Sequence, residues 1–412
     1  MTETVTGPPP GTADGGRALR GWLAANRREN LVLRDEATGT YQVFGYAETQ
    51  RMLKDAETFS SDFGRLVPAN PVTVRTPEGE RTVPNLLQGH LSVTDPPRHG
   101  KLRKLVSQAL TPRAVQALEG KIEEITAGLL DDMAGRDEVE MVEAFFNPLP
   151  VTVIAELLGV PAADHAMFRG WADALVSAHH DTGAVDSARL QVPDAMNHLL
   201  LEMESYVLDH AAHRRRNPSD DVLSRLVAAE VEGERLGESE VFTITLMLLL
   251  AGHISTTLLL GNSLICLNDN PDALAALRAD PGRVPAALEE VLRFSPPAPL
   301  AYRLTTRETT LGGVEIPADT MVASWVLSAN HDERQFADPE TFDVSRSPNP
   351  HLSFGHGIHF CIGAPLGRME ARIALSALLE RCPEPRFAEA PVYYESPTIF
   401  GVKRLVLSKP VA

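Results

Sequence analysis

The feature that most constrains the fold of this chain is a run of helical periodicity from about residue 96 to residue 295. Apolar residues recur there every three or four positions, as in AVQALEGKIEEITAGLLDDM (114–133) and in the long stretch 191–216. Pro and Gly end these segments, for example in LLGVPAAD and RRRNPSDD. A chain with this pattern is predicted to form a mainly helical body.

Strand signals occupy a smaller share of the chain. They appear in LVLRDEATGTYQVFG (31–45), in RLTTRETTLGGVEIP (303–317) and again over 385–410. No linker or repeat divides the sequence. We therefore expect a mainly α fold with a minor β portion, built as one domain over residues 16–412. Residues 1–15 are rich in Pro, Gly and Thr, which predicts a disordered N-terminal tail.

Composition limits the classes of partner. A formal net charge of −17 over 412 residues argues against nucleic acid. No apolar run approaches the ~18 residues that a membrane span needs, and the start has no basic and apolar leader. With only three cysteines, a disulfide framework is implausible. These features predict a cytoplasmic protein that binds neither nucleic acid nor a membrane.

One locally basic stretch stands out in this acidic chain, PPRHGKLRKLVSQALTPR (96–113). The commoner interpretation is a solvated helix face. The alternative is a docking patch for an acidic partner or a clamp on an anionic cofactor.

A second unusual stretch is MLLLAGHISTTLLLG (247–261), where a glycine and three hydroxyls interrupt an apolar helix. Buried hydroxyls cost free energy unless each finds a hydrogen-bond partner. The simpler interpretation is a kinked helix whose Ser and Thr bond to the carbonyl one turn earlier. The other is that the helix borders a cavity in which polar chemistry takes place.

The third is FGHGIHFCIG (354–363), which places Cys361 between a Gly-rich loop and a helix starting near Gly363. A thiolate there would be stabilised by backbone N–H groups and the helix dipole. A buried structural thiol and a zinc site with His356 and His359 are the alternatives, although the spacing fits no common zinc module. Neither alternative explains the glycines, which let a backbone approach a bulky planar group.

The last stretch resembles the F-G-x-G-x-H-x-C-x-G signature of the cytochrome P-450 haem-thiolate monooxygenases. EEVLR (289–293) is similar to the E-x-x-R motif of that family, DPPRHGKLR (95–103) to its H-x-x-x-R, and AGHISTT (251–257) to its A-G-x-[DE]-T. The motifs come in the family's order, and the resemblance to a soluble bacterial member covers about 16–410. It implies the cytochrome P-450 fold: a triangular helical prism with small β-sheets, holding haem between a long central helix and the Cys-loop helix.

The resemblance assigns roles to individual residues. The cofactor would be haem b (iron protoporphyrin IX), with Cys361 as the axial ligand of its iron and Phe354 shielding the thiolate. Gly355 and Gly363 belong to the same cofactor-binding loop. The positions that contact haem propionates in the family are His99, Arg103, Arg303 and His359. Glu290 and Arg293, with Arg346, would form a buried structural network.

In the central helix, Ala251 and Gly252 would let the backbone pass close over the haem with a local kink, and Ser255 and Thr256 would help deliver protons to oxygen. The sequence departs from the family here. Ile254 stands in place of the usual acid, and Ser255 in place of the usual Thr. Three explanations remain open: water and the two hydroxyls suffice, a substrate hydroxyl completes the relay, or the reaction needs less proton delivery.

Substrate contacts are predicted at apolar positions that match the family's substrate-contacting segments, although each could equally be core. They are Leu86, Leu87, Ile254, Leu300, Ile399 and Phe400. Together they suggest a sizeable lipophilic substrate.

The predicted reaction is insertion of one oxygen atom from O2, by hydroxylation or epoxidation, into a lipophilic secondary metabolite such as a polyketide or macrolide antibiotic. The alternatives are oxidative coupling or ring formation on a peptide or aromatic substrate, and a non-catalytic haem scaffold. Electrons would come from a ferredoxin and its NAD(P)H-dependent reductase. The predicted docking residues for the ferredoxin are Arg98, Lys101, Lys104 and Arg113.

Overall fold

The structure is a computed structural model. It describes residues 9, 11–65, 73–76, 79–83, 89–181 and 194–408, with the backbone alone at 65, 176–181, 194 and 195. The predicted substrate contacts Leu86 and Leu87 lie outside the described residues. Two compact units can be distinguished, residues 1–60, 122–149 and 255–412 as unit 1 and residues 61–121 and 150–254 as unit 2.

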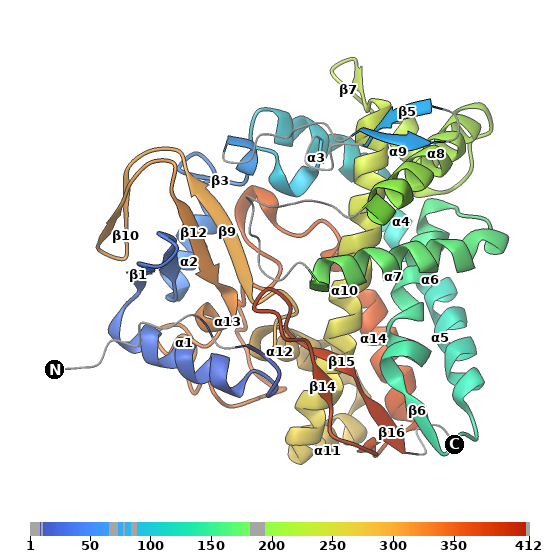
Figure 1. The fold of residues 1–412 in the computed structure, drawn as a ribbon. Helices are drawn as coiled ribbons and strands as arrows, with labels where there is room; N and C mark the ends of the chain where they lie inside the picture. The colour runs from blue at the N-terminus through green and yellow to red at the C-terminus, as the bar shows by residue number, and fades with distance from the viewer. Residues whose placement is uncertain are drawn as a thin grey trace. The chain divides into compact units, whose positions relative to one another are not determined.

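Unit 1 contains most of the β structure (Figure 1). Its largest sheet has the strand order β1-β2-β12-β9-β3, in which β12 pairs antiparallel with β9 and parallel with β2. The five strands are β1 (Val32–Arg34), β2 (Tyr41–Val43), β12 (Met321–Trp325), β9 (Leu300–Thr305) and β3 (Phe59–Ser60). A second sheet joins β13 (Arg386–Phe387), β16 (Val406–Ser408) and β6 (Glu138–Glu140). Two hairpins complete the set, β10 (Thr309–Leu311) with β11 (Val314–Ile316) and β14 (Val392–Tyr393) with β15 (Val402–Arg404).

The helices of unit 1 surround these sheets and carry the C-terminal part of the chain. They are α1 (Arg17–Glu29), α2 (Tyr46–Lys54), α11 (Pro271–Ala279), α12 (Val284–Phe294), α13 (Val326–Ala329) and α14 (Ala364–Arg381), with most of α5 (Glu119–Met133). A π-helical turn covers Val142–Phe146. Leu19 and Leu23 of α1 pack with Phe44 and Trp325 in one core cluster, which anchors α1 to the sheet.

Unit 2 is almost entirely helical. It contains α3 (Arg98–Ala109), α4 (Pro112–Gln116), α7 (His165–Asp181), α8 (Asp194–Arg216), α9 (Val222–Ala228) and most of α6 (Pro148–Leu158). Its two small hairpins pair β4 (Thr73–Thr76) with β5 (Gly79–Thr82) and β7 (Glu230–Val231) with β8 (Glu234–Arg235). Local sequence explains where helices start, since Thr111 caps α4 by accepting from the Ala114 N–H and Pro112 occupies its first turn.

The longest helix is α10 (Glu238–Asp269), whose first half belongs to unit 2 and second half to unit 1. Its composition would allow it to cross a membrane, but 72% of its most apolar window is buried inside the protein, as in the core helix of a globular fold. The prediction of a mainly α fold with a minor β portion is confirmed.

The N-terminal segment is more ordered than its composition predicts. Thr12 is buried, and its hydroxyl donates to the backbone carbonyl of Tyr394. Gly15 has a φ of +76°, and a Cβ there would come within 3.2 Å of the Tyr393 ring. The described part of the predicted tail is therefore packed against unit 1 before residue 16.

Candidate active site

The loop before α14 turns back on itself around Cys361. The Cys361 N–H donates to the Phe354 carbonyl at 2.8 Å, and the Gly355 N–H donates to the Leu352 carbonyl at 2.8 Å. Helix α14 begins three residues after the cysteine, and its first N–H, that of Ala364, points to the Cys361 carbonyl. Cys361 is exposed. This arrangement places an accessible thiol at a helix N-terminus, where a thiolate is stabilised.

The glycines of this loop have different structural reasons. Gly355 and Gly357 have φ values of +73° and +71°, in the left-handed region that favours glycine. A Cβ on Gly357 would also lie 3.0 Å from the backbone of Leu53 and Lys54 in α2, so close packing on α2 requires that glycine. Gly363 has an ordinary φ of −84°, and a Cβ there would sit 3.9 Å from the Cys361 sulfur. Among the three loop glycines, Gly363 alone has neither a left-handed φ nor a close backbone neighbour. Space for a bound group beside the Cys361 sulfur would account for it.

The donor chemistry around Cys361 fits a haem iron better than zinc. An exposed thiol at a helix start suits a single axial thiolate ligand. Within the described residues, no group of three His, Cys, Asp or Glu side chains comes together in a way that could hold a metal ion. His356 and His359 thus do not form a zinc site with Cys361, and the residues present fit a haem group bound through the cysteine alone.

The four residues predicted to contact haem propionates fall in both units. His99 and Arg103 lie one turn apart on α3 in unit 2, and burial together with the Arg103 charge lowers the pKa of His99. Arg303 and His359 lie in unit 1, both half-buried. One guanidinium N–H of Arg303 donates to the Tyr302 carbonyl at 2.7 Å. Each of the four side chains, guanidinium or imidazole, can donate a hydrogen bond to a carboxylate.

The centre of α10 presents two kinds of surface. Ala251 and Ser255, one turn apart, are exposed, whereas His253, Thr256 and Thr257 are buried. An exposed strip in the middle of an otherwise buried helix is what a ligand cavity requires. Burial lowers the pKa of His253 to about 4, so its imidazole is neutral.

Gly252 is explained by packing. Residues 251–257 of α10 are helical throughout, and the kink expected at Gly252 remains a prediction. A Cβ at Gly252 would approach Ile154 Cδ1 of α6 to 2.7 Å. The glycine lets α6 pack closely on this part of α10.

The buried hydroxyls of α10 have partners elsewhere in unit 1. Thr257 Oγ1 donates to the Phe146 carbonyl at 2.9 Å, in the π-helical turn. Thr256 forms a side-chain hydrogen bond with Glu370 of α14, and a Cβ on Gly367 would sit 3.9 Å from the Thr256 hydroxyl. The two hydroxyls thus have different surroundings: that of Thr256 faces Glu370 of α14, whereas Ser255 is exposed.

Glu370 is the functional candidate that sequence reasoning missed. Its side chain is 1% exposed. Burial raises the pKa of Glu370 to about 8, although the Thr256 hydrogen bond acts in the opposite direction. The signal was present, because Glu370 falls on the apolar face of α14 with Leu366, Ile373 and Ala374 at helical spacing. An acid in that position is held neutral at physiological pH.

Phe354, at the start of the cysteine loop, packs against the guanidinium of Arg368. Arg368 Cζ is 4.3 Å from the centre of the Phe354 ring. Arg368 donates to both carboxylate oxygens of Glu289, at 2.7 and 2.8 Å, and His351 Nε2 lies 3.1 Å from Glu289 Oε2. Burial alone would raise the pKa of Glu289, but the hydrogen bonds from Arg368 and His351 lower it to about 2. Glu289 is thus ionised and paired.

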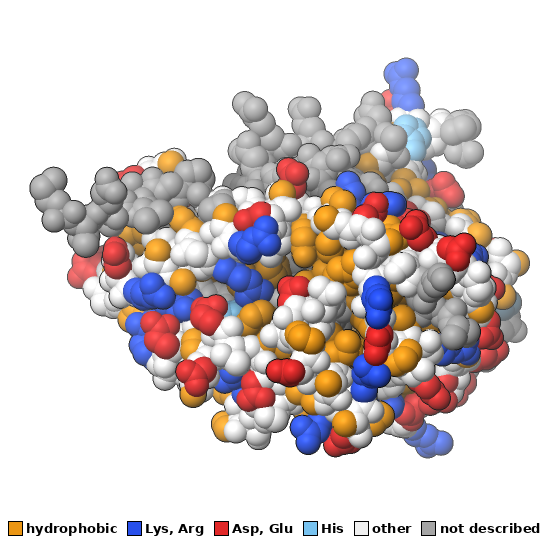
Figure 2. Space-filling model, turned by 90° about the horizontal axis from the view of Figure 1, so that it is seen from below, with side chains coloured by type: hydrophobic (Ala, Val, Ile, Leu, Met, Phe, Trp, Pro, Cys, Tyr) orange, Lys and Arg blue, Asp and Glu red, His pale blue; other side chains and the backbone are white. Residues whose placement is uncertain are grey.

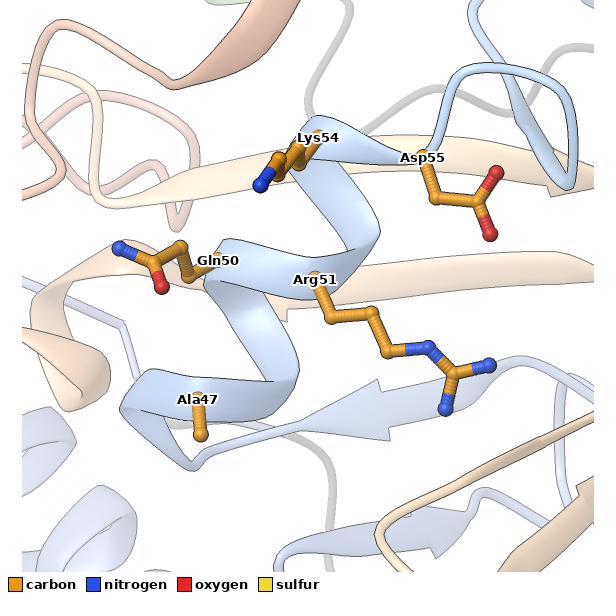
Figure 3. Close-up of a pocket in the computed structure, with 5 residues that line it drawn as sticks. All are labelled: Ala47, Gln50, Arg51, Lys54 and Asp55. Atoms are coloured by element: carbon orange, nitrogen blue, oxygen red, sulfur yellow. The ribbon is translucent and has the colours of Figure 1, made fainter.

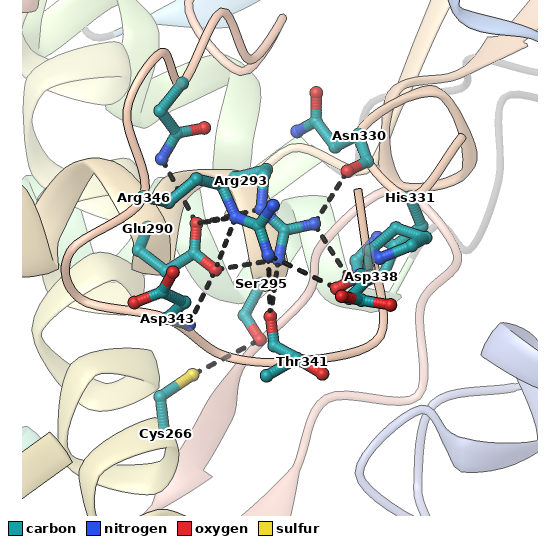
Figure 4. Close-up of polar contacts among 12 residues, drawn as sticks. Cys266, Glu290, Arg293, Ser295, Asn330, His331, Asp338, Thr341, Asp343 and Arg346 are labelled. Carbon is teal, nitrogen blue, oxygen red and sulfur yellow. Dashed lines mark hydrogen bonds and ion pairs between the residues drawn. The ribbon is translucent and has the colours of Figure 1, made fainter. Parts of the chain in front are cut away.

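Figure 4 shows that Glu290, Arg293 and Arg346 lie together. Arg293 is fully buried and donates twice to Glu290 at 2.8 Å. Its other N–H groups donate to the carbonyls of Asn330, Pro339 and Thr341. Arg346 Nε lies 3.2 Å from the Glu290 carboxylate. The network therefore joins α12 to the irregular segment before the cysteine loop, with every N–H of Arg293 satisfied.

The predicted substrate contacts receive different environments. Ile254 and Leu300 are half-buried, so both have side-chain surface left for a ligand. Ile399 and Phe400 are each 5% exposed. Phe400 belongs to the core cluster of α1, and the Arg20 guanidinium stacks 5.1 Å from its ring. The prediction of a substrate contact is wrong for Phe400, because its ring is covered by α1.

The basic stretch of α3 is partly neutralised. Arg98 forms ion pairs with Glu234 and Glu240, and Lys101 forms one with Glu234. Lys104 and Arg113 are exposed. Two of the four predicted docking cations are thus paired within unit 2, which leaves the positive charge concentrated on the other two.

A shallow hollow on α2 offers little chemistry (Figure 3). It is lined by Ala47, Gln50, Arg51, Lys54 and Asp55. Arg51 donates to the Thr310 carbonyl, and Asp55 accepts from the Thr58 N–H, so both side chains have structural roles.

Comparison with known proteins identifies the family. The cytochrome P-450 family model matches residues 181–383. The chain is 40% identical over 398 residues to the cyclomarin C epoxidase CymV of Salinispora arenicola, covering 96% of this chain and 97% of that protein. It is 44% identical over 374 residues to the erythromycin C-12 hydroxylase of Saccharopolyspora erythraea, covering 90% of this chain and 89% of that protein.

Solved structures agree with the sequence relatives. The ligand-free structure of cytochrome P-450 TbtJ1 superposes with a TM-score of 0.86 at 43% identity, covering 97% of this chain and all of that one. With the motif-bearing cysteine loop in place and identity near two-fifths over almost the whole length, the chain belongs to the cytochrome P-450 family and is a cytochrome P-450 monooxygenase.

Proposed function

We propose that this monooxygenase hydroxylates or epoxidises a lipophilic secondary metabolite of the macrolide or related polyketide class. The observation that carries the haem-thiolate assignment is the exposed Cys361 at the start of α14, with its N–H held by the Phe354 carbonyl. The macrolide class and hydroxylation are supported by the erythromycin C-12 hydroxylase, and epoxidation by the cyclomarin C epoxidase.

Haem b, when bound, supplies the oxygen-activating and electron-accepting chemistry. In this proposal the Cys361 thiolate would hold the haem iron. His99, Arg103, Arg303 and His359 would be the donors for its propionates. Ala251 and Ser255 form the exposed strip of α10 that would be open to a bound ligand.

Glu370 takes the place of the acid that is absent at Ile254. A carboxyl whose pKa is about 8 keeps its proton at pH 7 and can donate it to the Thr256 hydroxyl. Thr256 can in turn release its own proton toward Ser255, and a water molecule must bridge the two because neighbouring residues on a helix do not face each other. The sequence left three explanations open. This proposal extends the first of them, in which water and the two hydroxyls deliver protons, by adding Glu370 as an internal proton source.

The proposed role of Glu370 as a proton source is tested by measuring how much product forms per NADPH oxidised. In Glu370→Gln, with a surrogate ferredoxin system, we expect NADPH oxidation to continue while the share that ends in organic product falls. Glu380→Gln, an exposed acid at the far end of α14, is the matched control. Equal product yield per NADPH in wild type and Glu370→Gln would remove Glu370 from the relay.

The substrate class is tested by optical titration of the ferric protein. Macrolactones, linear polyketides and cyclic peptides are added in turn while the Soret band is followed. A low- to high-spin shift with macrolactones alone supports the proposal, and a shift with cyclic peptides alone would overturn it in favour of the coupling or ring-forming alternative. Product analysis then separates an oxygenated product from a coupled one, and a protein that shifts but yields neither would be a haem scaffold.

Electrons are proposed to arrive from a ferredoxin and its NAD(P)H-dependent reductase, in the cytoplasm. The exposed Lys104 and Arg113 are the proposed contacts for the acidic ferredoxin.

A further inference from the structure

Arg368 occupies a central position on the cysteine side of unit 1. Its Cζ lies 4.3 Å from the centre of the Phe354 ring, which is well within cation–π range. The same guanidinium donates two short hydrogen bonds to Glu289 of α12. The His351 ring, 6.0 Å from the Phe354 ring, is itself held by Glu289. Phe354 is thus fixed by residues from two helices.

Phe354 is connected directly to the cysteine. Its carbonyl accepts the Cys361 N–H at 2.8 Å, so any movement of residue 354 is transmitted to the backbone of residue 361. Arg368 is a charged neighbour in the same segment, on α14 (Ala364–Arg381), which begins three residues after Cys361. Hydrogen bonds to Glu289 raise the pKa of Arg368, so its guanidinium carries a positive charge.

We propose that the Glu289–Arg368 pair is a positioning device that sets the reduction potential of the haem bound at Cys361, by holding Phe354 in place and by balancing one positive against one negative charge beside the thiolate. This proposal rests on the proposed haem-thiolate function. The residues of the pair are positioning residues, which act through Phe354 and the loop that holds Cys361.

The charge removed by each variant determines whether the reduction potential rises or falls. Reduction of the iron adds one negative charge to the site, which a nearby cation favours and a nearby anion opposes. Arg368→Met leaves the Glu289 carboxylate with His351 as its remaining partner and should lower the potential. Glu289→Gln leaves Arg368 uncompensated and should raise it. Because the two charges cancel, the double variant should return close to the wild-type value.

Solvent limits the size of these shifts, since the Arg368 side chain is 39% exposed. We expect each single variant to change the reduction equilibrium constant about three- to tenfold, which corresponds to about 30 to 60 mV for a one-electron couple. Arg368→Lys keeps the charge but loses the planar fork, and should stay closer to wild type than Arg368→Met.

The experiment is a spectroelectrochemical titration of the haem-loaded full-length protein and these four variants. Arg381→Met is the matched control, because it removes an ion-paired arginine at the other end of the same helix. Opposite shifts for the two single variants, with cancellation in the double variant, support the proposal. Shifts in the same direction, or none beyond that of Arg381→Met, would overturn it.

Failure of the underlying function has a different signature. If the wild type, loaded with haem and reduced under carbon monoxide, lacks a thiolate-type Soret band, then the haem-thiolate proposal itself is wrong. If that band is present in every variant while the potentials are unchanged, only the role of the Glu289–Arg368 pair is disproved. A variant that does not retain haem is replaced in the comparison by Arg368→Lys.

Discussion

At the scale of single residues, the acid that we propose as the proton source is Glu370, which lies outside the family's motif position. Ile254 stands at the position where the family has its acid, yet Glu370 reaches Thr256 from a different helix. A carboxyl that is almost fully buried without a cation beside it stays protonated, because desolvation disfavours its charged form. Because the pKa of Glu370 is higher in the folded than in the unfolded state, the free energy of unfolding depends on pH through this carboxyl.

Glu370→Gln should alter how stability depends on pH. Below about pH 4.5 the carboxyl is protonated in both states, and its full contribution to stability is present. As the pH rises from there through about 8, the unfolded chain ionises first, so wild-type stability falls by up to about 1.4 kcal/mol per pH unit. Gln cannot ionise, and the variant should lose less stability over this range.

Urea midpoints at pH 5, 7 and 9 measure this difference. We expect the wild-type and Glu370→Gln midpoints to diverge as the pH rises, with the variant the more stable at pH 9. Glu380→Gln should follow the wild type. Parallel curves for wild type and Glu370→Gln would show that Glu370 is ionised in the folded protein.

At the scale of helices, Gly252 shows how a residue taken for a catalytic feature can be a packing feature. Gly252→Val would push side-chain atoms into Ile154 and should cost about 1–3 kcal/mol of unfolding free energy. Adding Ile154→Ala should recover part of that loss, because it removes the atoms that clash. Gly128→Val on α5, where a Cβ meets nothing within 4 Å, should cost less than about 0.5 kcal/mol. Additive effects of Gly252→Val and Ile154→Ala in urea unfolding would contradict this account.

The buried network of α12 should behave as a structural unit. Arg293→Met leaves Glu290 buried with part of its partners gone, and should cost about 3–5 kcal/mol. Arg278→Met breaks an exposed pair with Glu384 and should cost under about 1 kcal/mol. Urea unfolding gives the free energies, and the haem-to-protein absorbance ratio shows whether Arg293→Met also loses cofactor. An effect of Arg293→Met as small as that of Arg278→Met would disprove the structural role.

How much the sequence predicted depends on whether a signal was local. The cysteine loop and α12 carry contiguous motifs, so Cys361, Glu290 and Arg293 could be recognised without a structure. The helical periodicity over 191–216 matches α8 (Asp194–Arg216), whereas the stretch 114–133 is divided between α4 (Pro112–Gln116) and α5 (Glu119–Met133). By contrast, the partner of Thr256 and the covering of Phe400 by Arg20 join segments that are distant in sequence. No pattern within either segment specifies such a contact.

At the scale of the whole molecule, the net charge of −17 makes the placement of exposed cations important for an acidic partner. On the face drawn in Figure 2, the coloured acidic and basic side chains are interspersed among apolar ones. The ion pairs of Arg98 and Lys101 with Glu234 could not be read from the composition of residues 96–113, since Glu234 lies in a hairpin more than a hundred residues later.

Lys104→Glu should therefore weaken reduction by ferredoxin more than it weakens substrate binding. Arg136→Glu, also at an exposed residue, makes the same change in net charge and is the control. Stopped-flow reduction at low salt should slow severalfold for Lys104→Glu, and the difference should shrink as salt screens the charges. Equal rates for wild type and Lys104→Glu at low salt would remove Lys104 from the docking surface.

The central claim is that Cys361 holds the iron of a haem through its thiolate. The most direct measurement is the Soret band of the ferrous carbon monoxide complex, recorded for the wild type and for Cys361→His. We predict a thiolate-type, red-shifted band in the wild type and its replacement in Cys361→His by the band of a histidine-ligated haem. A thiolate-type band that persists in Cys361→His, or a haem-loaded wild type that never shows one, would contradict the account.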